Sequence, residues 1–148
     1  MARPELQLDN QLCFLFHRVG RELNAAYRPL LADLGLTYPQ YLTMLVLWER
    51  DGLTVGEIGD RLALDSATLS PLLRRLSQSG LVSKTRDPDD ERRVTVHLTV
   101  EGRALEVRAA AVPGEVAGYL VDGLEGYTAL RGQLIALLER MTQSAEAR

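Results

Sequence analysis

The chain has 148 residues, of which 46% are hydrophobic and 25% charged, and its formal net charge is −3. This length suits one domain with a hydrophobic core of its own, and the composition is that of a globular protein. The slightly acidic balance argues against nonspecific binding of nucleic acid over the whole surface, but it is compatible with a local basic patch.

The expected compartment follows from what the sequence lacks. No apolar run reaches the roughly 18 residues of a membrane span. The opening "MARPELQLDN" has no apolar stretch of the signal-peptide type. One cysteine excludes an internal disulfide. We therefore expect a cytoplasmic protein with a reduced thiol and no membrane partner.

Two helices are predicted in the first third of the chain. Apolar residues recur at helical spacing from Leu8 to Leu31, and Gly35 offers a stop. A second helix begins at Thr37, whose side chain can form a capping box with Gln40, and it extends to about Arg50. The apolar positions that define the first helix are Leu12, Leu15, Phe16, Val19 and Leu23.

The next two predicted helices are shorter. Thr54 and Glu57 form a second capping-box pattern, and a further helix runs from Ser66 to Gln78 with Asp65 or Ser66 as its cap. Two short helices joined by about four residues are typical of a helix-turn-helix. The side chains expected to face the core are Leu69, Leu72, Leu73 and Leu76.

The hydrophobic period then changes to that of strands. Residues 81–86 and 92–99 alternate apolar and polar, and "DPDDE" separates them. This pattern predicts a two-stranded hairpin with an acidic tip, a wing. Thr99 caps a helix to about Val112, Pro113 and Gly114 interrupt it, and an apolar helix closes the chain.

The predicted fold is mainly α with a small β-hairpin wing, a winged helix-turn-helix. We expect a single domain, residues 1–148, in which residues 37–99 form the winged helix-turn-helix. The long apolar helices at about residues 8–35 and 100–143 do not bury themselves within one small domain. They suggest a dimerisation layer built from both ends of the chain.

The helix-turn-helix and wing carry the expected contacts with double-stranded DNA. Small polar side chains at a helix N-terminus can approach phosphates and base edges, and a wing arginine can enter a minor groove. Carboxylates at the wing tip could hold that arginine by pairing with it. The alternative is a solvated hairpin with ordinary surface ion pairs. The candidate DNA-binding residues are Ser66, Thr68, Leu69, Ser70, Pro71, Arg74, Arg75, Lys84, Arg86, Arg92 and Arg93.

No catalytic or metal-binding constellation is visible. His17 and His97 lie far apart and lack cysteines at zinc-ligand spacing. No phosphate-binding glycine motif or nucleophile elbow is present. We therefore expect no catalytic residues, no metal and no cofactor.

Cys13 has two interpretations. Free cysteine is commonly a small buried hydrophobe. The hydroxyls of Tyr27 and Tyr38, however, lie in an otherwise aliphatic region, and a thiolate would accept hydrogen bonds from two such donors. Cys13 and Tyr27 are fourteen residues apart on one predicted helix, which is roughly 21 Å along its axis. If they meet, Cys13 of one subunit faces the tyrosines of another.

The sequence resembles the MarR family of winged-helix repressors and, within it, the organic-hydroperoxide-sensing repressors of the OhrR type. The resemblance covers nearly the whole chain, and "LDNQLCF", "AYRPLL" and "LGLTYPQYL" are its most specific motifs. It implies a homodimer in which Cys13 is held by the tyrosines of the partner, which map onto Tyr27 and Tyr38. It also implies a recognition helix at Ser66 to Gln78 and a wing arginine at Arg92.

The chain departs from some of these relatives at two points. Where some have a further tyrosine near the thiol, this chain has His17, which is either another donor or a partly exposed helix residue. Some relatives also carry a second cysteine, and its absence here resembles the one-cysteine type.

The expected function is a repressor that binds a palindromic operator while Cys13 is reduced. An organic hydroperoxide would oxidise the thiol to sulfenic acid, and a low-molecular-weight thiol or excess oxidant would carry the reaction further. Two alternatives stay open: release by a small aromatic or phenolic ligand in the dimer-interface pocket, and a thiol peroxidase.

Overall fold

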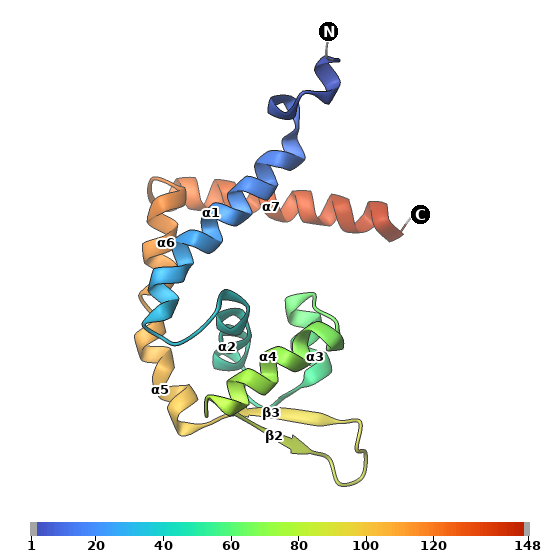
Figure 1. Ribbon diagram of the computed structural model, residues 1–148, viewed down its shortest axis with the longest axis vertical. Helices are drawn as coiled ribbons and strands as arrows, with labels where there is room; N and C mark the ends of the chain where they lie inside the picture. Colours follow the sequence, from blue (N-terminus) through green and yellow to red (C-terminus); the bar gives the residue numbers. More distant parts are fainter. Residues whose placement is uncertain (1–2, 147–148) are drawn as a thin grey trace. The chain divides into compact units, whose positions relative to one another are not determined.

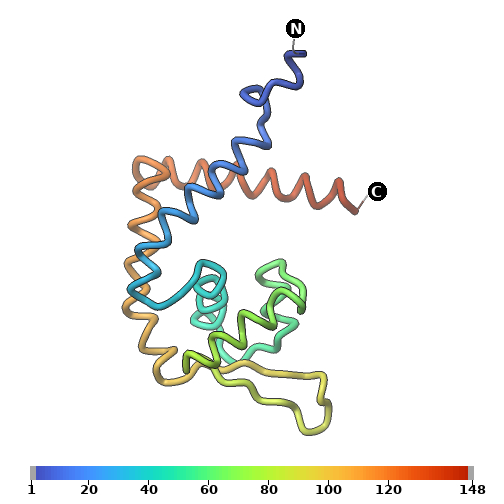
Figure 2. Tube along the Cα trace, viewed as in Figure 1, coloured from blue at the N-terminus to red at the C-terminus, as the bar shows by residue number. Residues whose placement is uncertain are grey.

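The computed structural model describes residues 3–146, and Figure 2 traces their path. The chain divides into two compact units, the first ending at Ala110 and the second beginning at Ala111. Each is described in turn, with the labels of Figure 1. No helix within residues 3–146 is long and apolar enough to cross a membrane.

The first unit opens with a long helix. Helix α1, Leu12–Ala32, follows two single turns of 3-10 helix at Pro4–Leu6 and Leu8–Asn10. The prediction of a helical start at Leu8 is therefore wrong by four residues, because the backbone at Gln11 is extended and no side chain caps the helix there. The helix is then unbroken, which confirms that Cys13 and Tyr27 share it.

Helix α2, Tyr38–Glu49, lies at the centre of this unit. The predicted capping box is confirmed: the Gln40 backbone N–H donates to the Thr37 hydroxyl, and the Thr37 N–H donates to the Gln40 side-chain oxygen at 2.9 Å. Tyr41, Met44 and Leu47 on this helix are buried. The helix therefore supplies core side chains to the elements around it.

Helices α3, Val55–Leu62, and α4, Ser66–Gln78, form the predicted helix-turn-helix. Thr54 caps α3 with the predicted Glu57 capping box, and Asp65 rather than Ser66 caps α4. The turn is tight, because a side chain at Gly59 would place its Cβ 2.7 Å from the Leu64 carbonyl oxygen. Ala63 completes the turn in the left-handed region, with φ of 53°.

The sheet has three strands where the sequence predicted two. Strands β2, Val82–Arg86, and β3, Val94–Leu98, form the predicted antiparallel hairpin, and β1, Leu53–Thr54, pairs with the other edge of β3. A two-residue strand is too short to show a periodic pattern. The hairpin protrudes from the helices of its unit, as expected of a wing (Figure 1).

The prediction of one helix from Val100 to Val112 is corrected by the structure. Helix α5, Val100–Ala109, is capped by the Thr99 hydroxyl, which accepts from the Gly102 N–H. The interruption comes before Pro113, which sits in the first turn of α6, Val112–Leu120, where its missing N–H is harmless. In the second unit α6 precedes the long closing helix α7, Gly123–Glu146.

These elements confirm a mainly helical fold with a small β wing, a winged helix-turn-helix. Apolar side chains remain exposed near the start of α1 and along α6 and α7, among them Phe16, Val19, Leu124 and Leu138. In each unit, exposed apolar side chains that follow one another along a helix are typical of a surface that binds another chain.

Candidate nucleic-acid interface and thiol site

Helix α4 presents most of its candidate DNA contacts to solvent. Ser66, Thr68 and Ser70 in the first turns are exposed, as are Pro71, Arg74 and Arg75. Its opposite face is held in the core by Leu73 and Leu76. The amphipathic pattern of α4 thus fixes which side chains can reach a DNA groove.

Leu69 is predicted both to face the core and to contact DNA; the structure confirms the first prediction and corrects the second. Its side chain has no exposed surface and belongs to the core beneath α4. The position lies among exposed polar residues in the sequence, but the helical period turns it inward. The structure therefore assigns Leu69 to the support of α4 rather than to contact with DNA.

The N-terminus of α4 is stabilised by Asp65. Its carboxylate accepts a hydrogen bond from the Thr68 N–H at 2.8 Å. This bond, with further donation from the Thr68 side chain, lowers the pKa of Asp65 below its ordinary value. The carboxylate therefore keeps its charge well into the acid range.

The wing continues the basic surface beside α4. Lys84 and Arg86 on β2 are exposed. With Ser70 of α4 they line a hollow of about 280 Å³. The structure thus brings a hydroxyl from the helix and two cations from the strand to one face, a combination suited to a phosphate backbone.

The carboxylates at the wing tip do not hold the arginine side chains, so that part of the prediction is wrong. Asp87 accepts from the Asp89 N–H at 2.9 Å, and Asp90 accepts from the Arg92 N–H at 3.0 Å. Within residues 3–146 neither Arg92 nor Arg93 forms an ion pair. Aspartate side chains commonly close turns in this way, and here they shape the wing.

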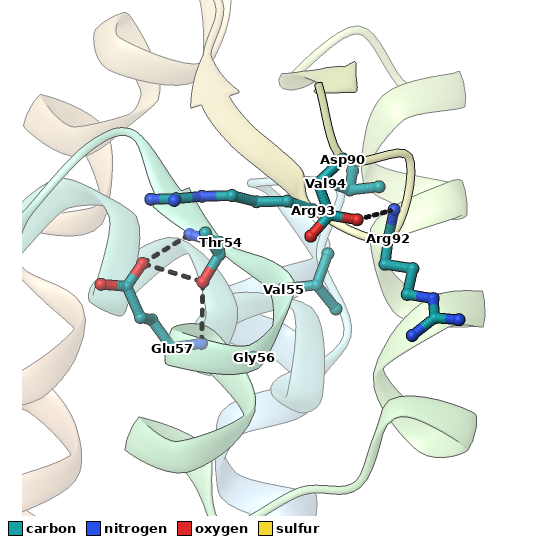
Figure 3. A pocket seen from close by; sticks show the side chains of 8 residues that line it. All are labelled: Thr54, Val55, Gly56, Glu57, Asp90, Arg92, Arg93 and Val94. Carbon is teal, nitrogen blue, oxygen red and sulfur yellow. Dashed lines mark hydrogen bonds between the residues drawn. The ribbon is translucent and has the colours of Figure 1, made fainter. Parts of the chain in front are cut away.

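The two wing arginines point in different directions. In Figure 3 the Arg93 side chain extends toward Thr54 and Glu57 at the start of α3, whereas the Arg92 side chain points away from them. Both line an open hollow of about 410 Å³. Hydrogen bonds from the Thr54 N–H and hydroxyl lower the pKa of Glu57, and the positive charges of Arg50 and Arg93 add to the effect.

Cys13 is exposed, so it is not the buried small hydrophobe of the alternative interpretation within its own chain. His17, one turn further along α1, is also exposed. Around them lie the exposed apolar side chains Leu12, Leu15 and Phe16. The thiol therefore lies within an apolar surface rather than a core.

The two tyrosines lie together at the other end of α1. The ring centroids of Tyr27 and Tyr38 are 4.6 Å apart, and the two rings line a half-enclosed cavity of about 310 Å³. Burial raises the pKa of Tyr38, so its hydroxyl keeps its proton and can donate it in a hydrogen bond. Leu31, Leu36 and Pro39 supply the apolar wall.

Cys13 is not part of this cavity in its own chain. It is fourteen residues from Tyr27 on an unbroken helix, roughly 21 Å along the axis. The structure thus joins the two predicted tyrosines and keeps the predicted thiol apart from them.

Sequence reasoning missed two aromatic neighbours of the cavity. The ring centroid of Tyr41 lies 5.9 Å from that of Tyr27 and 6.4 Å from that of Tyr38, and it is 6.4 Å from that of Trp48. The signal was present, since Tyr38 and Tyr41 are three residues apart and share a helix face. Across residues 3–146 no cluster of three or more His, Cys, Asp or Glu side chains could hold a metal.

Comparisons with known proteins agree with this architecture. The family model described as "Transcriptional regulator SarA/Rot" matches residues 25–106. The organic hydroperoxide resistance transcriptional regulator of Bacillus subtilis is 44% identical over 138 residues, covering 93% of this chain and 94% of that protein.

Solved structures of other proteins are also similar to this chain in their fold. Reduced AbfR bound to DNA superposes with a TM-score of 0.80 at 34% identity, covering 97% of this chain and 98% of that one. Overoxidized AbfR bound to DNA gives 0.73 at 35% identity, covering 95% and 99%. The winged helix-turn-helix and the extent of these matches place the chain in the MarR/SarA family of transcriptional regulators, which are not enzymes.

Proposed function

We propose that this chain represses transcription as a homodimer and leaves its operator when an organic hydroperoxide oxidises Cys13. The observation that carries the proposal is the separation of the thiol and the tyrosine pair along α1. Two α1 helices packed antiparallel would place Cys13 of each copy beside the partner's Tyr27 and Tyr38. The exposed apolar surface around Cys13 supports such packing.

The tyrosines give the thiol its reactivity in this arrangement. Two protonated phenols would donate hydrogen bonds to the sulfur and favour the thiolate, which is the nucleophile. The apolar wall of the cavity favours a hydroperoxide with an apolar substituent over hydrogen peroxide. His17 lies one turn from Cys13 and is a further candidate donor.

Oxidation proceeds by attack of the thiolate on the outer peroxide oxygen. An S–O bond forms, the O–O bond breaks, and the departing alkoxide takes a proton and leaves as the alcohol, so Cys13 becomes a sulfenic acid. A low-molecular-weight thiol can then displace the hydroxyl as water and form a mixed disulfide. Further hydroperoxide instead yields the sulfinic and sulfonic acids.

Either product enlarges the sulfur group and replaces the thiolate that the tyrosines bind. The contact between α1 and the partner's cavity then changes, and with it the separation of the two α4 helices. Paired recognition helices must match half-sites about 34 Å apart, so a small displacement weakens binding strongly. AbfR, a relative solved on DNA when reduced and also solved in a disulfide form, supports an oxidation-sensitive regulator of this build. Because overoxidized AbfR was also solved on DNA, we expect the mixed disulfide to be the product that releases the operator most completely.

The DNA-binding side consists of the exposed residues of α4 and the wing. Ser66, Thr68 and Ser70 at the start of α4 would reach base edges and phosphates. Lys84 and Arg86 would bind the backbone, and Arg92, free of any ion pair within residues 3–146, would enter the adjacent minor groove. The partner is double-stranded DNA with a palindromic site.

The test uses a duplex selected from a randomised pool by the reduced wild-type protein. Cumene hydroperoxide should abolish binding by the wild type and leave Cys13→Ser bound, because serine cannot form a sulfenic acid. Tyr38→Phe should slow oxidation while keeping the ring. Equal release of the serine variant would contradict the proposal.

A second candidate function is favoured by the cavity itself. Its tyrosine rings and apolar wall would also accept a small aromatic or phenolic ligand. Such a ligand would release DNA without any oxidant and would act equally on Cys13→Ser. Phenol and benzoate, added to both proteins under reducing conditions, separate the two candidates.

A further inference from the structure

A continuous row of contacts leads away from the tyrosine cavity. Tyr41 is buried, and its ring centroid lies 5.9 Å from that of Tyr27 and 6.4 Å from that of Tyr38. The Tyr41 ring also packs edge-on with Trp48, with ring centroids 6.4 Å apart and planes inclined at 67°. All four rings lie within the first unit. The last ring in this row of contacts is that of Trp48, whose indole N–H is a hydrogen-bond donor.

The indole N–H of Trp48, on α2, forms a hydrogen bond with a helix that is distant in the sequence. Trp48 Nε1 donates to the backbone carbonyl oxygen of Gly102, 2.8 Å away and 54 residues further along the chain. Gly102 lies in the first turn of α5. Since the acceptor is a backbone group, a displacement of the indole ring acts on the helix itself rather than on a mobile side chain.

The next contact joins α5 to the end of the recognition helix. A Cβ added to Gly102 would lie 2.1 Å from the Leu81 carbonyl oxygen, so the two backbones touch directly. The Leu81 N–H donates to the Leu76 carbonyl oxygen in the last turn of α4, at 3.0 Å. Five successive contacts therefore connect the tyrosine cavity with the C-terminal end of α4.

The start of α5 is also held to the wing. The Thr99 hydroxyl donates to the Gly80 carbonyl oxygen at 2.6 Å, and the Thr99 N–H donates to the Leu81 carbonyl oxygen at 3.1 Å. Arg103 pairs with Asp51, whose carboxylate also accepts from the backbone N–H of Leu98 at the end of β3. The beginning of α5, the end of α4 and the base of the wing are thus tied together.

We propose that Trp48 is a positioning residue that transmits changes in the tyrosine cavity to helix α4 through its hydrogen bond to Gly102. Close-packed interiors transmit small displacements because few voids absorb them. Tyr41 at the centre of the row is buried, and the contacts beyond Trp48 join backbone groups, so a displacement of the rings is passed on to the backbone. This proposal deepens the proposed function by naming the route of its regulation, and it rests on that function only for the oxidant as the input.

The test is a double-mutant cycle on DNA affinity with the reduced protein, so that no oxidant is needed. Tyr38→Ala perturbs the cavity, and Trp48→Phe keeps a ring beside Tyr41 but removes the N–H. We expect Tyr38→Ala to lower the affinity for the selected duplex, and we expect that effect to shrink about fivefold in the Trp48→Phe background. About fivefold corresponds to one neutral hydrogen bond. If Trp48 only supports the fold, the fold-changes in affinity caused by Tyr38→Ala and by Trp48→Phe should simply multiply in the double variant.

Matched variants isolate the route. Thr43→Val removes a hydroxyl that donates to the Pro39 carbonyl oxygen on the same helix, away from the row, and should leave the effect of Tyr38→Ala unchanged. Tyr41→Phe keeps the ring contacts and should do the same, whereas Tyr41→Leu should reduce the effect as Trp48→Phe does. Tyr41→Phe acting like Tyr41→Leu would contradict transmission through ring packing.

Fluorescence provides a readout that needs no change at Trp48. Trp48 is the single tryptophan of the chain, so the emission of the folded protein comes from the ring in question. Tyr38→Ala should shift that emission, and so should cumene hydroperoxide in the wild type but not in Cys13→Ser. Unchanged emission in Tyr38→Ala, or independent effects in the cycle, would overturn the proposed route. Failure of hydroperoxide to release DNA from the wild type would instead overturn the proposed function alone.

Discussion

Replacement of Gly102 by alanine tests the close approach of helix α5 to the backbone of Leu81. The new Cβ would lie 2.1 Å from the Leu81 carbonyl oxygen and 3.1 Å from its carbon, and the obstacle is backbone that cannot rotate away. A tolerable Cβ contact begins at about 3.0 Å, so α5 or the Leu81 peptide must move by roughly 0.9 Å.

The cost of that movement can be estimated from its parts. Overpacking of this kind costs about 3 kcal/mol. The displacement also weakens the bond from Trp48 to Gly102 and the bond from Thr99 to Leu81, which together lose about 1 kcal/mol. Alanine regains about 1 kcal/mol of helix propensity. The net loss is about 3 kcal/mol, which lowers the Tm of a chain of this size by about 6–12 °C.

Thermal unfolding followed by circular dichroism at 222 nm measures the effect, with the thiol kept reduced. Gly56→Ala is the matched control, since Gly56 also lies in the first turn of a threonine-capped helix and has no atom within 4 Å of its would-be Cβ. That variant should match or exceed the wild-type Tm. If Gly102→Ala also melts at or above the wild-type temperature, the close approach of α5 to Leu81 is refuted.

Three further predictions concern the DNA-binding elements. Leu69→Ala should lose about 2–5 kcal/mol of stability in urea unfolding, whereas Leu69→Met should keep both the fold and DNA affinity, unless Leu69 contacts DNA after all. The hydrogen bond from Thr68 lowers the folded-state pKa of Asp65, so its stabilisation is present above the unfolded pKa and is lost as pH falls through the folded value. The wild type should accordingly lose its stability advantage over Asp65→Ala on acidification. Asp65→Asn has a cap that does not titrate, so its stability advantage over Asp65→Ala should stay constant. Thermal unfolding measured across a pH series checks both expectations. Arg92→Ala should weaken duplex binding about tenfold and flatten its salt dependence by about one unit in the log–log slope, with a smaller effect of Arg93→Ala, whose side chain extends toward α3; fluorescence anisotropy across a salt series would show equal effects if this division is wrong.

Local patterns in the sequence were enough to predict most of the secondary structure. The capping residues Thr37, Thr54 and Thr99 each begin the helix that they predict. Gly35 and Gly80 follow their helices with positive φ, the region in which glycine is not penalised. Such signals act within one helical turn, and for that reason they can be recognised in the sequence without knowledge of the tertiary structure.

The boundaries that failed depend on longer-range packing. Strand β1 has only two residues and forms because β3 pairs with it. A strand this short has no periodic pattern from which it could be predicted. The break between α5 and α6 comes at residues 110–111, ahead of the proline that suggested it. In both cases the chain nearby is compatible with several conformations, and its neighbours select one.

For the functional residues, the sequence by itself determined the winged helix-turn-helix, the basic residues of the wing, and the fact that an unbroken helix separates Cys13 from Tyr27. Only the tertiary structure decided that the wing-tip aspartates bind backbone N–H groups instead of arginine side chains, and that Trp48 reaches Gly102. The physical reason is that helical spacing depends on neighbours three and four residues apart, whereas those contacts depend on how whole elements pack against one another.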